Sequence, residues 1–260
     1  MTRVLRCLPL LLLAALSLPA SAASTSNLAR EKSYAGQIEK YLVVGDAIRL
    51  EARGVKFLAL DTKPENPPAK GAVILLHGRG VHPAWGFFDK LRMDIAEDKG
   101  WRTLSIQLPI LGADTPVEQY GPTLPEAFER IDAAIAHLKK SGIKNIVLLG
   151  HSSGAVTATH YLAGRPANTA QGVLLLGLGP GFPPYESLKP FASLKLPILD
   201  VSGGKDFPYV LEQLPVRKQA AAKTGNRQYR QAQVPGANHF YADHYSQLRT
   251  QVFAWLDSLK

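Results

Sequence analysis

The sequence predicts an α/β fold with a mostly parallel central sheet and helices on both of its faces. Short apolar runs alternate with helical patterns along most of the chain, and several of these runs are apolar at every position. Strands of a parallel sheet covered by helices need apolar residues on both faces, whereas a surface helix needs them on one stripe. No linker interrupts the alternation within the 260 residues, so we expect one α/β domain.

Eight segments have the composition of strands, and they cover residues 41–49, 55–60, 72–77, 103–108, 145–149, 172–176, 197–201 and 228–234. Helical patterns cover 27–40, 87–99, 125–141, 153–163, 209–223 and 243–259. The connections 109–123 and 177–196 are short and contain several prolines, which leave little room for helices. We therefore expect these two connections to form no more than a minimal lid over a functional site.

The N-terminus has the pattern of a secretory signal. Arg3 and Arg6 precede an apolar run over 8–18, and small residues suited to cleavage follow over 19–23. The run is shorter than the roughly 20 residues that a transmembrane helix needs. We expect cleavage after Ala22 or Ala23, and hence a signal over 1–22, an N-terminal extension over 23–40 and the α/β domain over 41–260. The expected location is periplasmic or secreted.

Export predicts an N-terminus at Ala23 or Ser24 in protein recovered from the periplasm. Mass spectrometry of the intact protein checks this expectation, and an intact Met1 in a membrane fraction would contradict it.

Cysteine content and charge exclude several classes of site. The one cysteine, Cys7, lies in the expected signal, so the exported chain has no disulfide and no cysteine metal site. The net charge of +9 becomes about +7 once Arg3 and Arg6 are removed, nine minus two. No basic run exceeds two residues, which argues against nucleic acid as a partner. This charge allows weak association with anionic envelope surfaces, without a stable membrane anchor.

A nucleophilic serine is indicated by the G-x-S-x-G pattern at 150–154. The pattern directly follows an apolar strand and opens a helix, which is the strand–turn–helix setting that such a serine requires. Glycines at Gly150 and Gly154 avoid collisions of side chains with neighbouring backbone at this sharp turn. A plain turn with Ser152 as the helix N-cap is the alternative.

A serine nucleophile needs a base and an acid that orients the base. Asp206 and His239 each follow a later strand within a Gly-containing loop, in the chain order Ser, Asp, His. We expect this triad to carry the chemistry. Other candidates lie inside a strand or on helices, and they are Asp200, Asp243, His137, His160 and His244.

Two backbone N–H groups should bind the oxyanion that forms during the reaction. The N–H of Ser153 begins the helix after the serine, and the N–H of Arg79 lies in the loop after an earlier strand. The Arg79 side chain is expected to be solvated, with contact to an anionic substrate as the lesser alternative. Supporting roles are expected for His77, Gly78, Gly80, Gly150, His151 and Gly154.

These motifs together resemble the α/β-hydrolase superfamily over residues 41–260. The stretches 45–50, 57–60, 76–83 and 103–109 further resemble an exported proteobacterial α/β-hydrolase family of unassigned function. The resemblance implies an α/β-hydrolase fold and a carboxylesterase-like serine hydrolase acting on a small-molecule or envelope-derived acyl substrate. Arg79 departs from the lipase pattern, where many esterases have a third consecutive glycine.

Other functions remain open at this point. Acyl transfer or peptide cleavage can use the same triad, and a non-catalytic envelope binding protein can use the same scaffold. The sequence has no metal-ligand motif, no G-x-G-x-x-G and no P-loop, so we expect neither a metal nor a cofactor.

Overall fold

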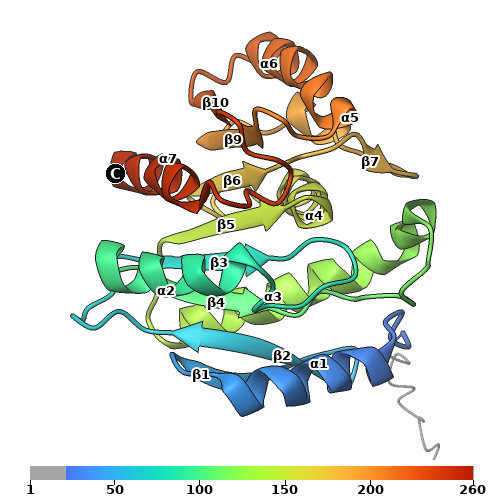
Figure 1. Ribbon diagram of the computed structural model, residues 1–260, viewed down its shortest axis with the longest axis vertical. Coiled ribbons are helices and arrows are strands. Elements are labelled where there is room, and N and C mark those ends of the chain that lie inside the picture. Colours follow the sequence, from blue (N-terminus) through green and yellow to red (C-terminus); the bar gives the residue numbers. More distant parts are fainter. Residues whose placement is uncertain (1–21, 260) are drawn as a thin grey trace, which may run out of the picture.

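The computed structural model describes residues 22–259, and its elements form a sheet with helices on both faces (Figure 1). Residues 1–21, which hold most of the expected signal, lie outside the described residues. The strands of the main sheet are β1 Asp46–Ala52, β2 Val55–Thr62, β3 Ala72–Leu76, β4 Arg102–Ile106, β5 Ile146–His151, β6 Gly172–Leu176, β9 Ile198–Gly203 and β10 Tyr229–Val234. The helices are α1 Leu28–Tyr41, α2 Phe87–Lys99, α3 Leu124–Lys140, α4 Ser153–Ala163, α5 Pro208–Leu211, α6 Gln213–Lys223 and α7 Tyr245–Ser258.

The eight-stranded sheet has the order β1-β2-β4-β3-β5-β6-β9-β10. Strand β2 is antiparallel to both of its neighbours, and every other pair in this sheet is parallel. The expected mostly parallel sheet is therefore confirmed. A separate hairpin of β7 Gly181–Phe182 and β8 Tyr185–Glu186 and two 3₁₀ helices, η1 Val117–Thr123 and η2 Lys189–Ala192, occupy the connections where we expected a minimal lid.

Strand β3 shows how the core is divided between the two faces of the sheet. Its five residues are all buried, as expected for a central parallel strand. Ile74 and Leu76 pack in one cluster with apolar residues of α3 and α4. Val73 and Leu75 pack in the other cluster with residues of α2 and α7, which Figure 1 shows together on one face.

Two element boundaries differ from those expected. The strand expected over 41–49 begins at Asp46, because α1 continues to Tyr41 and the apolar side chains of Tyr41 and Val43 remain 72% and 91% exposed. The helix expected over 209–223 is broken into α5 and α6. Pro215 has no N–H to donate to the carbonyl of Leu211, the last residue of α5, so the helix is interrupted there.

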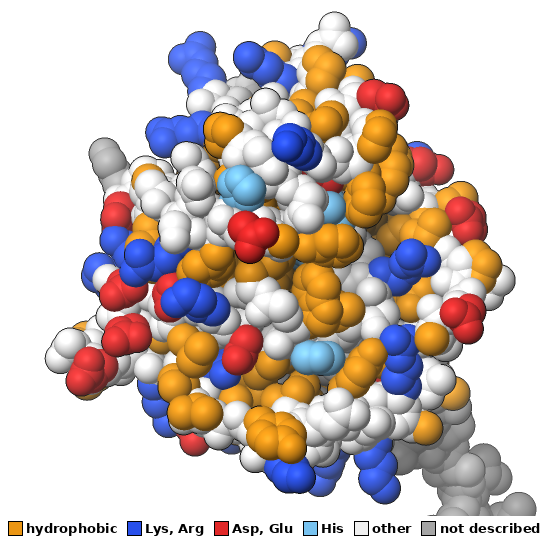
Figure 2. All heavy atoms as spheres, viewed as in Figure 1, with side chains coloured by type: hydrophobic (Ala, Val, Ile, Leu, Met, Phe, Trp, Pro, Cys, Tyr) orange, Lys and Arg blue, Asp and Glu red, His pale blue; other side chains and the backbone are white. Residues whose placement is uncertain are grey.

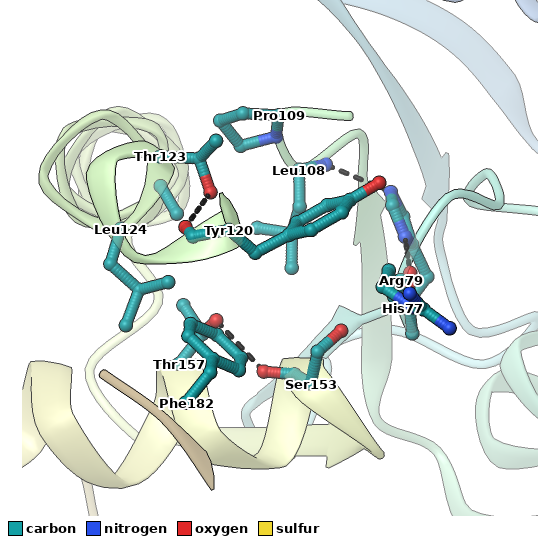
Figure 3. A pocket seen from close by; sticks show the side chains of 12 residues that line it. His77, Arg79, Leu108, Pro109, Tyr120, Thr123, Leu124, Ser153, Thr157 and Phe182 are labelled. Carbon is teal, nitrogen blue, oxygen red and sulfur yellow. Dashed lines mark hydrogen bonds between the residues drawn. The ribbon is translucent and has the colours of Figure 1, made fainter. Parts of the chain in front are cut away.

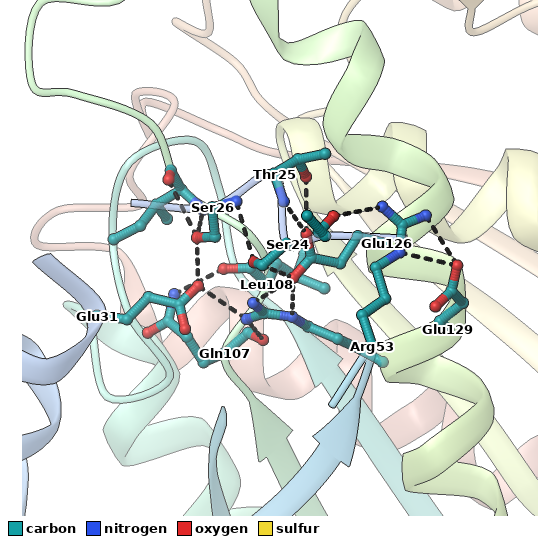
Figure 4. A network of polar contacts seen from close by, with 12 residues as sticks. Ser24, Thr25, Ser26, Glu31, Arg53, Gln107, Leu108, Glu126 and Glu129 are labelled. Carbon is teal, nitrogen blue, oxygen red and sulfur yellow. Dashed lines mark hydrogen bonds and ion pairs between the residues drawn. The ribbon is translucent and has the colours of Figure 1, made fainter. Parts of the chain in front are cut away.

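The N-terminal segment is joined to the sheet domain by a polar network (Figure 4). The Thr25 N–H and hydroxyl and the Ser24 hydroxyl donate to the carboxylate of Glu126, which is fully buried. Arg130 Nη2 pairs with Glu126 at 2.6 Å, and its Nη1 pairs with Glu31 of α1 at 2.8 Å. Burial raises the pKa of Glu31, although the Arg130 charge opposes that rise. The expected extension over 23–40 thus packs on α3 through buried charges.

None of the helices within residues 22–259 is both long and apolar enough to cross a bilayer.

Candidate active site

Four loops carry the expected site residues, and all four leave the sheet at the carboxyl ends of parallel strands. Ser152 follows β5, Asp206 follows β9 and His239 follows β10, while the loop 77–80 follows β3. In open α/β sheets this edge is where ligands bind. The sheet order places β3 beside β5, so the oxyanion loop lies next to the serine.

Ser152 sits on a sharp turn between β5 and α4. Its backbone has φ 55° and ψ −119°, a strained conformation for a residue with a side chain. A Cβ added to Gly150 would overlap the Gly154 backbone, and one added to Gly154 would overlap the carbonyl oxygen of Leu76. The pattern therefore needs both glycines for space. The Ser152 side chain makes no N-cap hydrogen bond to α4, so the alternative role as a helix cap is wrong.

Asp206 and His239 form a buried pair. His239 Nδ1 donates to Asp206 Oδ1 at 2.6 Å, and the two residues are 4% and 5% exposed, respectively. The carboxylate also accepts the backbone N–H groups of Phe207 at 2.8 Å and Gly203 at 3.2 Å. These bonds fix the carboxylate and hold the imidazole in the tautomer that leaves Nε2 free to accept a proton.

Ser152 and His239 line the same cavity. Within residues 22–259 no hydrogen bond joins the Ser152 hydroxyl to His239. In serine enzymes without substrate, the hydrogen bond between the serine and the histidine is commonly long or poorly aligned, and it shortens in the reactive complex.

The two expected oxyanion donors flank this cavity. Ser153 is the first residue of α4, where backbone N–H groups have no partner within the helix. The Gly78–Arg79 peptide is fixed by His77, whose Nδ1 donates to the Gly78 carbonyl at 2.7 Å. A peptide held by its carbonyl presents its N–H, here that of Arg79, in the opposite direction.

His77 holds that peptide in its neutral form. It is 1% exposed, and burial lowers its pKa to about 3. Its Nε2 accepts the N–H of Leu108 at 2.9 Å, which requires an unprotonated nitrogen at that position. The expected support from His77 therefore has a defined geometry.

His151 supports the base rather than replacing it. Its Nε2 donates to the backbone carbonyl of His239 at 3.0 Å, and the two ring centroids lie 4.9 Å apart. Its ring also stacks on Trp85 at 6.0 Å. Burial lowers the pKa of His151 to about 3, so its neutral ring places no charge beside His239.

We expect the free energy of unfolding to fall as the pH drops below about 6.5. The folded state keeps His77 and His151 neutral down to a pKa of about 3, against an ordinary value of 6.5. The unfolded chain binds protons on both rings through that range while the folded chain does not. Each histidine therefore costs about 1.4 kcal/mol of stability per pH unit between these limits. Urea unfolding at about pH 7.5 and pH 5 measures this slope.

The matched controls for this experiment are two histidine variants. His151→Asn and His77→Asn should each remove the share of one histidine from the pH slope. A slope that His151→Asn does not alter would contradict the assignment of His151 as buried and neutral.

The other acids and histidines have partners away from the serine. Asp200 is fully buried and pairs with Arg217 at 2.7 Å, which matches its expected place inside a strand. His137 contacts Asp61 at 3.2 Å. The rings of His160 and His244 bond to backbone carbonyls at 3.0 and 2.8 Å, and Asp243 is exposed with a φ of 59°.

A cavity of about 540 Å³ opens over the serine. Its walls come from the oxyanion loop, η1, the start of α4, the β7 region and the loops that carry Asp206 and His239. Figure 2 shows apolar side chains gathered around a hollow on this face of the molecule. Aromatic rings line the cavity at Trp85, Phe182, Phe207, Tyr209, His239 and Phe240.

A smaller cavity of about 20 Å³ lies between the oxyanion loop, α3 and α4 (Figure 3). Buried side chains of Tyr120, Leu124 and Phe182 line it. The Thr157 hydroxyl, also in its wall, donates to the Ser153 carbonyl at 2.9 Å, so it turns no free donor inward. This volume suits one group about the size of a methyl or a water molecule.

No cluster of three or more histidine, cysteine, aspartate or glutamate side chains with the arrangement of a metal site occurs among the described residues.

The aromatic residues of the cavity were not predicted from the sequence, which contains only a weak signal for them. Phe207 and Phe240 stand next to the expected acid and base, and that adjacency was the one available sign.

Comparisons with known proteins agree with this fold. A family described as "Protein of unknown function (DUF3530)" matches residues 3–127 and 122–258. No curated protein matches the chain by sequence. Among solved structures, Est1E from Butyrivibrio proteoclasticus is similar with 18% identity and a TM-score of 0.65, over 81% of this chain and 97% of that one.

Two further solved structures are similar at low identity. Dienelactone hydrolase from Anabaena variabilis has 20% identity and a TM-score of 0.65, over 83% of this chain and 98% of that one. An acylaminoacyl peptidase from Pyrococcus horikoshii has 14% identity and a TM-score of 0.66, over 87% of this chain and 43% of that one. The expected α/β-hydrolase fold is therefore confirmed.

Proposed function

Because this chain belongs to the DUF3530 family of unknown function, we propose its function from the site itself, as an exported serine hydrolase of ester or related acyl bonds. The observation that carries the proposal is the juxtaposition of a strained serine turn with a buried Asp206–His239 pair over one cavity. A turn of this kind serves to expose a nucleophile. Two of the similar solved structures are a dienelactone hydrolase and an acylaminoacyl peptidase, and these names support the hydrolase class.

In the proposed acylation step, Ser152 Oγ attacks the acyl carbon and His239 Nε2 takes the hydroxyl proton. The carbonyl oxygen gains negative charge, which the N–H groups of Arg79 and Ser153 stabilise. Asp206 stabilises the imidazolium that forms. His239 then gives the proton to the leaving alcohol, and the C–O bond of the ester breaks.

In the proposed deacylation step, water takes the place of the alcohol. His239 Nε2 accepts a proton from this water, whose oxygen attacks the acyl carbon. Collapse of the second tetrahedral intermediate returns the proton to Ser152 Oγ and releases the acid. The cavity volume of about 540 Å³ accommodates both water and a small ester.

The sparse cover over the cavity predicts simple kinetics. The covering segments are short, and within the described residues they contain no long helix that could open and close. Gly121 of η1 also packs directly against the backbone of Pro183. A short-chain p-nitrophenyl ester should therefore follow Michaelis–Menten kinetics, preceded by a burst of nitrophenol if deacylation is slower. A jump in rate when a long-chain ester passes its solubility limit would contradict the open site.

A further inference from the structure

An aromatic residue follows both the acid and the base in the chain. Phe207 comes directly after Asp206, and Phe240 comes directly after His239. Their side chains are 38% and 46% exposed, and the nearby Tyr209 is 48% exposed. Large exposed apolar groups gathered at a cavity mouth are typical of a ligand site, because water wets them at a free-energy cost until a ligand covers them.

Two of these rings, those of Phe207 and Phe240, lie against the imidazole of His239. The ring centroid of Phe207 lies 4.6 Å from that of His239, and the centroid of Phe240 lies 5.3 Å from it. Phe207 stacks on Tyr209 at 5.2 Å, and Trp85 meets Phe240 edge-on at 5.5 Å. We call Trp85, Phe207, Tyr209 and Phe240 the aromatic clamp.

The chemistry of the proposed reaction decides which part of an ester faces the clamp. His239 must give its proton to the leaving oxygen, so the alcohol part of the ester lies next to the His239 ring. The acyl part lies on the side of the oxyanion donors Arg79 and Ser153, which line the same large cavity as His239. The clamp is therefore on the alcohol side.

We propose that the substrates are esters whose alcohol part carries an aromatic ring. This inference rests on the proposed function and names the substrate class of the same site. The clamp itself contains no charged side chain, which favours a neutral ring over an anionic or cationic one. Its mixture of stacked and perpendicular rings provides faces and edges for a further ring to pack against.

Three esters test the proposal on the full exported chain. 2-Phenylethyl acetate and 2-cyclohexylethyl acetate share an acyl group and release primary alcohols of similar basicity, so their intrinsic reactivity is matched. The cyclohexyl ester is the more apolar, so hydrophobicity alone would favour it. We expect kcat/KM to be about tenfold higher for the phenyl ester, the gain that ring–ring contacts provide beyond buried area. Ethyl 3-phenylpropanoate, which places the ring on the acyl side, should be the poorest of the three.

Variants locate the effect. Phe240→Leu and Phe207→Leu should each reduce the phenyl-to-cyclohexyl ratio toward one, and Phe240→Trp should restore it by returning a ring. Tyr41→Leu, at an aromatic ring that is 72% exposed outside the cavity, should leave the ratio unchanged. Equal turnover of the phenyl and cyclohexyl esters, or preference for ethyl 3-phenylpropanoate, would overturn the proposal.

A second measurement separates this inference from the proposed function. 2-Phenylethanol should slow the labelling of Ser152 by a fluorophosphonate at about a tenth of the concentration of 2-cyclohexylethanol that gives the same effect. Equal potency of the two alcohols would overturn the inference while the serine hydrolase assignment stands. Absence of labelling in a folded sample would overturn the serine mechanism, and with it the inference.

Discussion

Ser152→Ala is expected to lower kcat for ester hydrolysis by about 10⁶-fold, the loss that follows removal of the nucleophile from a serine triad. The hydroxyl that this change removes makes no cap or other hydrogen bond with residues 22–259, so folding should be unaffected. Ser153→Ala is the matched comparison, because it removes a neighbouring hydroxyl and keeps the backbone N–H that binds the oxyanion. It should cost no more than about tenfold.

Kinetics with a p-nitrophenyl ester and circular dichroism of both variants measure these effects. A Ser153→Ala loss that matches or exceeds the Ser152→Ala loss would mean that the wrong serine has been assigned as the nucleophile.

Asp206→Asn should lower kcat by about 10⁴-fold while the protein stays folded. Asp206 accepts the Nδ1–H of His239 at 2.6 Å, and an amide nitrogen at this position would favour the wrong tautomer of the ring. Asp200→Asn is the control, because Asp200 lies within β9, shortly before the loop that carries Asp206, and pairs with the buried Arg217. Leaving Arg217 without its partner should cost about 3–5 kcal/mol of stability.

The two aspartate variants therefore differ in what they change. Asp206→Asn should act on kcat, and Asp200→Asn should act on the free energy of unfolding measured in urea. If the two effects were exchanged, the acid would lie within the strand rather than on the loop after it.

The sequence was informative where a residue type is forced by local geometry. Gly150 and Gly154 have no space for a Cβ, and β3 must be apolar on both faces, so both features could be predicted without a structure. The order of Ser152, Asp206 and His239 along the chain placed each at the end of a parallel strand, which the fold then brought to one edge.

Other features depend on contacts between distant parts of the chain. Glu126 accepts hydrogen bonds from Thr25, 101 residues away, and nothing local in the sequence indicates that this carboxylate is buried. The clamp depends likewise on contact between Trp85 and Phe240, which lie far apart in the sequence. By contrast, the break between α5 and α6 has a local signal in the sequence, which is Pro215. The expectation of one continuous helix over 209–223 did not take this proline into account.

The central claim is that Ser152 is the nucleophile, and the most direct test maps the adduct formed by a fluorophosphonate. After labelling of the folded protein and proteolysis, mass spectrometry of the peptides should find one modified residue, Ser152. Asp206→Asn should slow formation of this adduct, because the base that activates the serine loses its orienting partner. A modification on Ser153 or on any other residue, or no modification in a folded sample, would contradict the account.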